Sequence, residues 1–266
     1  MPDVPPRHPR HHTGLAGVIE VRGILGETVA NLGTRILGGE WLPGQGIPIE
    51  ADLCTQLGVS RSVVREAFRI LGAKGLIRSR TSDGTRVQPR HEWRLLDPDV
   101  MDWRMRAGDT KALLQDLLTL RLVLEPGVVH TATLAADDAA RTRIRAAWAW
   151  KEQVFHTPEA DYARRRQHFI DADLEFHRAF LAAVESPLLS QLFAVIEAAL
   201  GLLLDLQMRA RGYMTEMIGM DESQDLHAAV FAAFEAQDAA AAEAAMRHLI
   251  TRAIQDAHRG FQALEA

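Results

Sequence analysis

Cysteine is almost absent from this chain: its 266 residues include a single one, Cys54. One cysteine excludes an intrachain disulfide, and such scarcity is typical of proteins that work in a reducing cytosol. No apolar run reaches the roughly 20 residues that a membrane-spanning helix needs. The N-terminal sequence MPDVPPRHPRHH also lacks the apolar core of a secretory signal. We therefore expect a cytoplasmic protein without a membrane partner.

Residues 1–17 are predicted to form a disordered arm. Their histidines could hold a metal loosely, but a solvated tail is the favoured interpretation. The apolar fraction of the whole chain is 47%, which is ordinary for a globular protein and sufficient for a sizeable core. The length is typical of one large domain or two smaller ones.

Charge is distributed unevenly along the chain. The formal net charge is −5, yet the segment from residue 60 to residue 90 carries eight basic and two acidic side chains. An acidic protein with one basic segment is expected to bind a polyanion there.

The segment at 18–90 is predicted to fold as a winged helix-turn-helix domain. Helices are expected at 18–38, 49–57 and 61–74, with Ser60 as the N-cap of the third helix and Gly75 ending it. The stretches LIRSR and TRVQP then flank Ser82-Asp83-Gly84, which is typical of a β-hairpin.

The rest of the chain is predicted to be a packed linker at 91–108 followed by an all-α domain at 109–260. The linker contains Asp97-Pro98, interpreted as a break in regular structure, and two tryptophans that should pack. Helices are expected at 109–135, 138–153, 160–184, 187–211, 222–236 and 239–258. The fold class is therefore mainly α.

Three arginines, Arg61, Arg65 and Arg69, recur one turn apart in the third predicted helix. The apolar residues gather on a neighbouring stripe, so one face should pack and the other should be basic and exposed. Most such faces are merely solvated, and Glu66 could pair with its neighbours. The preceding helix, the tight turn and the following hairpin favour a recognition helix whose arginines read guanine in the major groove.

The motif VSR..VREA..IL..KGLI, followed by GTRV, resembles the amino-terminal domain of GntR-family bacterial transcription regulators. The resemblance implies a homodimer on an inverted-repeat, double-stranded operator, with the wing Gly84 near the minor groove. One departure is Ala51, where many members carry arginine, so the operator cannot be carried over. The expected DNA-binding residues are Ser60, Arg61, Ser62, Arg65, Arg69, Gly84, Thr85 and Arg86.

Asp173 and His177 are spaced i,i+4 in the middle of the apolar face of a predicted helix, and His227 lies among apolar residues in another. His227 lies nine residues before Ala236 and His248 ten after Asp238, which puts both roughly 14–15 Å from the turn between their helices. Three imidazoles and a carboxylate suit zinc, nickel or another divalent metal. The alternative is an Asp–His hydrogen bond and two core histidines.

DLEFH at 173–177 and the two later histidines resemble the FCD ligand-binding domain of the FadR-type branch, whose metal-binding members show this order of ligands. Arg121 lies among leucines in RLVLEP, which resembles a segment lining the cavity of that domain. It is expected either to clamp a ligand carboxylate or to pair with Glu125.

These features together predict a one-component regulator, expected to be a repressor. A small organic acid at the metal's open positions would shift the dimer toward or away from its operator-binding geometry. WRLLDPDV is similar to regulators of sugar-acid catabolism, which favours galactonate- or gluconate-like effectors. The rivals are a metalloenzyme with an open three-histidine site and a structural metal site without an effector.

Overall fold

The structure is a computed structural model that describes residues 23–157, 160–194, 196–197, 201 and 220–265. The predicted arm at 1–17 lies outside these residues, as do the beginning of the first predicted helix and much of the helix predicted at 187–211. Within the described ranges, no helix is both long enough and apolar enough to cross a membrane.

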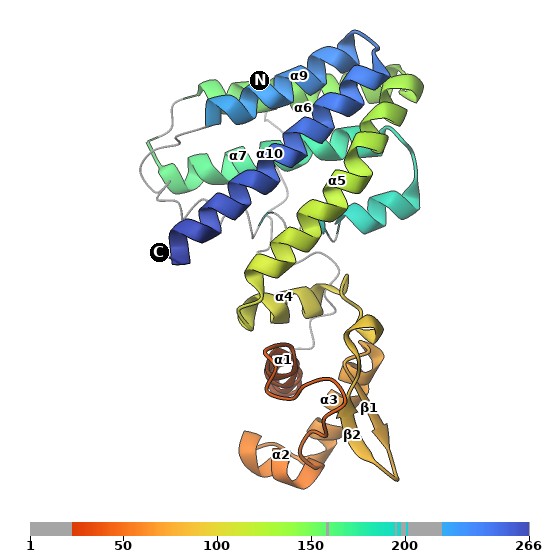
Figure 1. The fold of residues 1–266 in the computed structure, drawn as a ribbon, viewed down its shortest axis with the longest axis vertical. Helices are drawn as coiled ribbons and strands as arrows, with labels where there is room; N and C mark the ends of the chain where they lie inside the picture. Colours follow the sequence, from red (N-terminus) through yellow and green to blue (C-terminus); the bar gives the residue numbers. More distant parts are fainter. Residues whose placement is uncertain (1–22, 158–159, 195, 198–200, 202–219, 266) are drawn as a thin grey trace, which may run out of the picture.

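The N-terminal domain consists of three helices and a β-hairpin, at the bottom of Figure 1. The helices are α1 (Gly23–Leu37), α2 (Glu50–Leu57) and α3 (Arg61–Ala73). Strands β1 (Ile77–Arg80) and β2 (Gly84–Val87) pair antiparallel, with Ile77 opposite Val87. This arrangement confirms the predicted winged helix-turn-helix.

Local signals in the sequence set the ends of α3. The Ser60 side chain accepts a hydrogen bond from the Val63 N–H and so satisfies one of the donors that a helix start leaves free. Gly75 adopts the left-handed conformation with φ of 76°, as glycines that follow a helix commonly do. A Cβ at this position would lie 2.0 Å from the Glu92 carbonyl oxygen, so only glycine fits.

The segment predicted as a linker contains a short 3₁₀ helix, η1 (Arg90–Glu92), and a regular helix, α4 (Pro98–Arg106). The Asp97-Pro98 pair begins α4 instead of breaking the chain. The Asp97 carboxylate accepts from two backbone N–H groups, and a proline at the first helical position loses no hydrogen bond. Trp103 of α4 packs in the core of the N-terminal domain, whereas the neighbouring Met101 packs against the other half.

The remainder is an all-α bundle, as predicted. Its helices include α5 (Thr110–Ala135), α6 (Asp138–His156), α7 (Tyr162–Ala182), α9 (Met220–Glu235) and α10 (Ala239–Glu265). Residues 187–194, the described start of the helix predicted at 187–211, are helical as well. The long helices α5 and α10 pack together, and α6 packs on α7 (Figure 1). Helix α5 begins beside α4 and runs the length of the bundle, so it connects the interior of the bundle to the N-terminal domain.

Polar side chains are buried where α5, α6, α7 and α9 meet. The core around them is apolar and includes Phe176, Phe180 and Phe234. Burial of charged groups in such a core is costly unless they are paired, so their partners decide what the site can do. The buried polar residues of this region are Arg121, Glu125, Lys151, Asp173, His177, Gln224 and His227.

Candidate functional site

Helix α3 presents its polar residues to solvent because its apolar residues face the core. Val64, Ala67, Phe68 and Leu71 are buried. Residues predicted to bind DNA on this helix and at its cap are exposed: Ser60, Arg61, Ser62, Arg65 and Arg69. The wing adds exposed Gly84 and Arg86 and half-buried Thr85.

Three of the four arginines on this surface have a carboxylate partner. The Nε atom of Arg65 donates to Glu50 at 2.9 Å, and Arg69 pairs with Glu66 one turn earlier on α3. Arg86 pairs with Asp83 and also donates to the Gly44 carbonyl oxygen, which ties the wing to the turn after α1. Exposed pairs of this kind are worth little, so the arginines can exchange their partners for phosphate at small cost.

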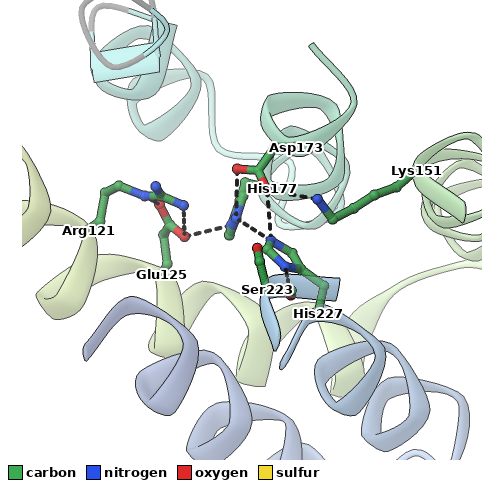
Figure 2. Close-up of polar contacts among 7 residues, drawn as sticks. All are labelled: Arg121, Glu125, Lys151, Asp173, His177, Ser223 and His227. Atoms are coloured by element: carbon green, nitrogen blue, oxygen red, sulfur yellow. Dashed lines mark hydrogen bonds and ion pairs between the residues drawn. The ribbon is translucent and has the colours of Figure 1, made fainter. Parts of the chain in front are cut away.

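The second site is a buried cluster formed by Asp173, His177 and His227, shown in Figure 2. Helix α7 supplies the first two and α9 supplies the third. The His227 Nε2 atom lies 3.0 Å from Asp173 Oδ1 and 3.4 Å from His177 Nε2, and His177 Nε2 lies 3.8 Å from Asp173 Oδ2. Ligand atoms around a tetrahedral zinc ion lie about 3.3 Å apart. The three distances bracket this value, with Asp173 facing each histidine through a different carboxylate oxygen.

The outer nitrogens of both imidazoles face acceptors. His227 Nδ1 lies 2.6 Å from the Ser223 carbonyl oxygen. His177 Nδ1 lies 2.7 Å from Glu125 Oε2, at the distance though not the alignment of a hydrogen bond. These acceptors favour the tautomers with the proton on Nδ1, in which both Nε2 lone pairs are directed inward, as in metal sites whose histidines are oriented by outer carboxylates and carbonyls. In these tautomers two lone pairs and a carboxylate converge, and they can serve as ligands of a cation.

Electrostatics keep the cluster in its ligating form. Burial would raise the pKa of Asp173, but Lys151 and His227 outweigh it and hold this pKa well below its usual range. Burial and the nearby Lys151 lower the pKa of His227 to about 4, so its imidazole is neutral near pH 7. A carboxylate and a neutral imidazole are the forms that bind divalent metals.

His248 does not join the cluster, which corrects the expectation that it is a fourth ligand. Its side chain is exposed on α10, whereas Leu249 and Ile250 face inward. The prediction used the height of His248 along its helix, and height does not determine direction around the axis. Met246, Leu249 and Ile250 define the buried stripe of α10 here, and His248 lies on the side of the helix opposite to it.

Arg121 is buried and forms two hydrogen bonds with Glu125, so the predicted ion pair exists. Burial would raise the pKa of Glu125, but Arg121 and His177 outweigh it and lower this pKa to about 2. Arg121 also lines a cavity of about 120 Å³ together with the metal-ligand candidates and apolar side chains such as Phe169 and Leu249. Pockets for drug-sized ligands measure about 300–1,000 Å³, so this cavity suits a smaller molecule.

Lys151 is a member of the cluster that sequence reasoning missed. It lies on α6 and its Nζ atom donates to Asp173 Oδ1 at 2.8 Å (Figure 2). The signal was present in the sequence, because Ala140, Ile144, Ala147 and Lys151 form the buried stripe of α6 at helical spacing. A lysine at a position where the pattern requires an apolar residue indicates a buried charge with a partner.

Comparisons with known proteins identify the family of each domain. The model "Bacterial regulatory proteins, gntR family" matches residues 26–87, and the FCD domain model matches residues 116–252. The galactonate operon transcriptional repressor of Escherichia coli K12 is 32% identical over 222 residues, which are 84% of this chain and 91% of that protein. The regulator LutR of Bacillus subtilis is 28% identical over 228 residues, which are 85% and 97% of the two chains. The structure of Streptococcus agalactiae GntR is 24% identical with a TM-score of 0.46, covering 87% of this chain and 99% of that one.

The fold and the exposed arginine surface define a winged helix-turn-helix regulator of transcription. The chain belongs to the GntR family of bacterial regulators and carries a C-terminal FCD domain. Regulators of this family bind operator DNA, and FCD domains bind small-molecule effectors. These relatives are transcription regulators and not enzymes, which argues against the metalloenzyme alternative.

Proposed function

We propose that this protein is a cytoplasmic homodimeric repressor whose affinity for its operator is controlled by a small organic acid. The acid binds in the FCD domain beside a divalent metal ion, with zinc as the first choice and nickel as the next. The observation that carries the proposal is the convergence of three ligand atoms from Asp173, His177 and His227, with the outer nitrogen of each imidazole facing an acceptor oxygen.

The charges around the cluster favour an anionic effector. Asp173 is paired with Lys151 and Glu125 with Arg121, so the four charges cancel. Because a divalent ion would then bring two uncompensated positive charges into a buried site, an anion is needed to balance them. When bound, the ion supplies a positive centre that a carboxylate and an adjacent hydroxyl can share. The cavity beside it has the size of a small acid.

Sugar acids of the aldonate type satisfy these requirements, because they carry a carboxylate, an adjacent hydroxyl and further hydroxyls. The E. coli relative is named for the galactonate operon, which makes D-galactonate the first candidate. Arg121 faces the cavity and is proposed to contact the acid while it remains paired with Glu125.

The DNA-binding part of the proposal uses the eight residues predicted from the sequence. Arg61 and Arg65 are proposed to read bases, since the N-terminal part of a recognition helix enters the major groove. The remaining residues are proposed to contact phosphate or the minor groove. The domain limits at 18–90, 91–108 and 109–260 are proposed with this function.

Metal content tests the metal site. Protein purified without added metal is expected to contain about one divalent ion per chain by elemental analysis. His177→Ala and His227→Ala should each lose most of it, whereas His248→Ala serves as the matched control and should retain it. Loss of metal in His248→Ala with retention in the other two variants would contradict the ligand set.

Calorimetry and operator binding test the effector. D-galactonate is expected to bind the metal-loaded protein and to change operator affinity, and chelation should abolish both effects. D-galactose, which lacks the carboxylate, is the matched control and should do neither. Arg121→Lys retains the charge beside Glu125 but loses the planar fork, so it should weaken the response and leave basal operator binding unchanged. A normal response to D-galactose would show that the carboxylate is not read.

A further inference from the structure

Lys151 is the most deeply buried charged side chain among the described residues, with no exposed surface. Its ammonium contacts Asp173 Oδ1 and lies 4.5 Å from the centre of the Phe169 ring. A lysine that reaches a carboxylate through an apolar core is held there by that carboxylate and by the aromatic face.

The contact falls on the oxygen that a bound ion would use. Asp173 Oδ1 is the carboxylate atom nearest to His227 Nε2, at 3.0 Å, and it is also the atom to which Lys151 donates, at 2.8 Å. In Figure 2 the lysine approaches Asp173 from one side while Glu125 and Arg121 lie on the other side of the cluster. The only carboxylate among the three ligand candidates is therefore already shared with a cation.

The other ligand candidates bring no negative charge to replace that of Asp173, which Lys151 already neutralises. His177 and His227 are imidazoles, and the fourth position expected for His248 is not supplied by it, since its side chain is exposed. The second carboxylate nearby, Glu125, contacts His177 and is itself neutralised by Arg121. Among the described residues, Asp173 is thus the only one of the three ligand candidates that brings negative charge to an ion at this cluster.

We infer that Lys151 sets the metal affinity of the FCD domain by competing with the ion for the Asp173 carboxylate. Without metal, the ammonium keeps the buried carboxylate paired, so the cluster can persist empty. With metal, the two cations repel one another across the same oxygen, so the ion is held more weakly than by three unshared ligands. Lys151 thereby makes metal binding at this site reversible. This inference rests on the metal site proposed above.

Zinc titration of the full-length, metal-stripped protein against a competing chelating dye tests the inference. Lys151→Met removes the charge and keeps the length of an unbranched side chain, and it is expected to bind zinc about tenfold or more tightly than the wild type. Lys74→Met is the matched control. Lys74 is another largely buried lysine paired with aspartates, Asp97 and Asp99, but it lies in the N-terminal domain. Its loss should leave zinc affinity unchanged.

Two further measurements locate the effect. The double variant Lys151→Met/His227→Ala should lose the gain in affinity, which assigns that gain to this cluster. Zinc should also raise the melting temperature of Lys151→Met by more than it raises that of the wild type, because the ion replaces the missing partner of Asp173. A variant that folds only after zinc is added supports the inference equally, and one that zinc does not restore overturns it.

The outcomes separate this inference from the proposed function. Equal or weaker zinc binding by Lys151→Met, with normal binding by the wild type, would overturn the role of Lys151 and leave the metal site intact. Zinc binding by the variant alone would overturn the proposed metal-dependent function and support the role of Lys151. Absence of zinc from both proteins would overturn both.

Discussion

The two halves of this protein both pair basic side chains with carboxylates, but they do so in different surroundings. On the DNA-binding surface, Arg65 and Arg69 each have 71% of the side chain exposed. In the FCD domain, Arg121 has 6% exposed and Lys151 none. An exposed pair gains little and breaks easily, whereas a buried charge that loses its partner is strongly destabilised.

This difference suits the two tasks. The surface proposed to exchange its partners for DNA phosphate uses charges that water already stabilises. The site proposed to hold a small ion or acid uses charges that the apolar core keeps in place, and their fixed positions define what can enter. Helix α5 connects the two, because Arg121 and Glu125 lie in the bundle while its first turns pack beside α4.

The largest expected effect comes from breaking a buried pair. In metal-free protein, Asp173→Ala should lower the free energy of unfolding by about 3–5 kcal/mol, because it leaves the Lys151 ammonium buried and unpaired. Urea denaturation with a chelator present measures the change. The double variant Asp173→Ala/Lys151→Met should recover part of the loss, and Asp83→Ala on the exposed wing should change stability little. A loss no greater than that of Asp83→Ala would erase the contrast between the two regions.

The second-largest effect is expected from acidification, which should lower the stability that the buried cluster contributes. The pKa of His227 is about 4 in the folded chain against an ordinary 6.5, so between these values the unfolded chain binds a proton that the folded chain does not. Metal-free protein should therefore lose stability as the pH falls from 6.5 to 4, and the contribution of His227 is complete above this window.

Urea denaturation at pH 7 and pH 5 tests this expectation, with His227→Gln as the variant that cannot titrate. The variant should lose less stability than the wild type over the same interval. If the two proteins showed the same dependence on pH, His227 would not be the group responsible.

A smaller effect is expected on the DNA-binding surface. Arg65→Ala should weaken binding to an operator selected from random DNA by about 1–3 kcal/mol per half-site, the worth of one bidentate arginine–guanine contact. Fluorescence anisotropy at matched salt measures it, and the variant should stay folded. Arg145→Ala, which removes an exposed arginine from the other domain, is the control. Wild-type affinity in Arg65→Ala would mean that α3 is not the reading helix.

The smallest effect is expected from Glu50→Gln, which frees Arg65 from its surface partner. Because such pairs contribute little, affinity for nonspecific DNA should rise by less than about threefold at low salt, and the difference should vanish as salt increases. A large loss of operator affinity would instead show that Glu50 positions Arg65 for recognition.

The elements that the sequence predicted well are those whose signals are local. Ser60, Gly75 and Gly84 mark the cap of α3, its end and the hairpin, and each does so through the conformation of its own backbone or a neighbour's. The same local rules applied to Asp97-Pro98 gave the wrong interpretation. An Asp-Pro pair is compatible either with a break in regular structure or with the start of a helix. Here it starts α4, whose Trp103 packs in the N-terminal core.

The candidate metal site was predictable in part. Asp173 and His177 share one face of a single helix, and any helix of this sequence would bring them together. His227 joins them, and His248 does not, because contact between helices depends on their rotation as well as on height along the axis. Lys151 was identifiable only as an anomaly in an apolar stripe, since its partner lies on α7.

The sequence by itself determined the winged helix-turn-helix, the exposed arginine face and the all-α class of the second domain, because capping, turn conformation and helical periodicity act over a few residues. Only the tertiary structure decided which charges meet in the core. There, Lys151 of α6 and Glu125 of α5 complete a cluster begun on α7 and α9. The physical reason is that a buried charge is stabilised by whichever partner the packing of other helices brings within contact, and that choice is not encoded near it in the chain.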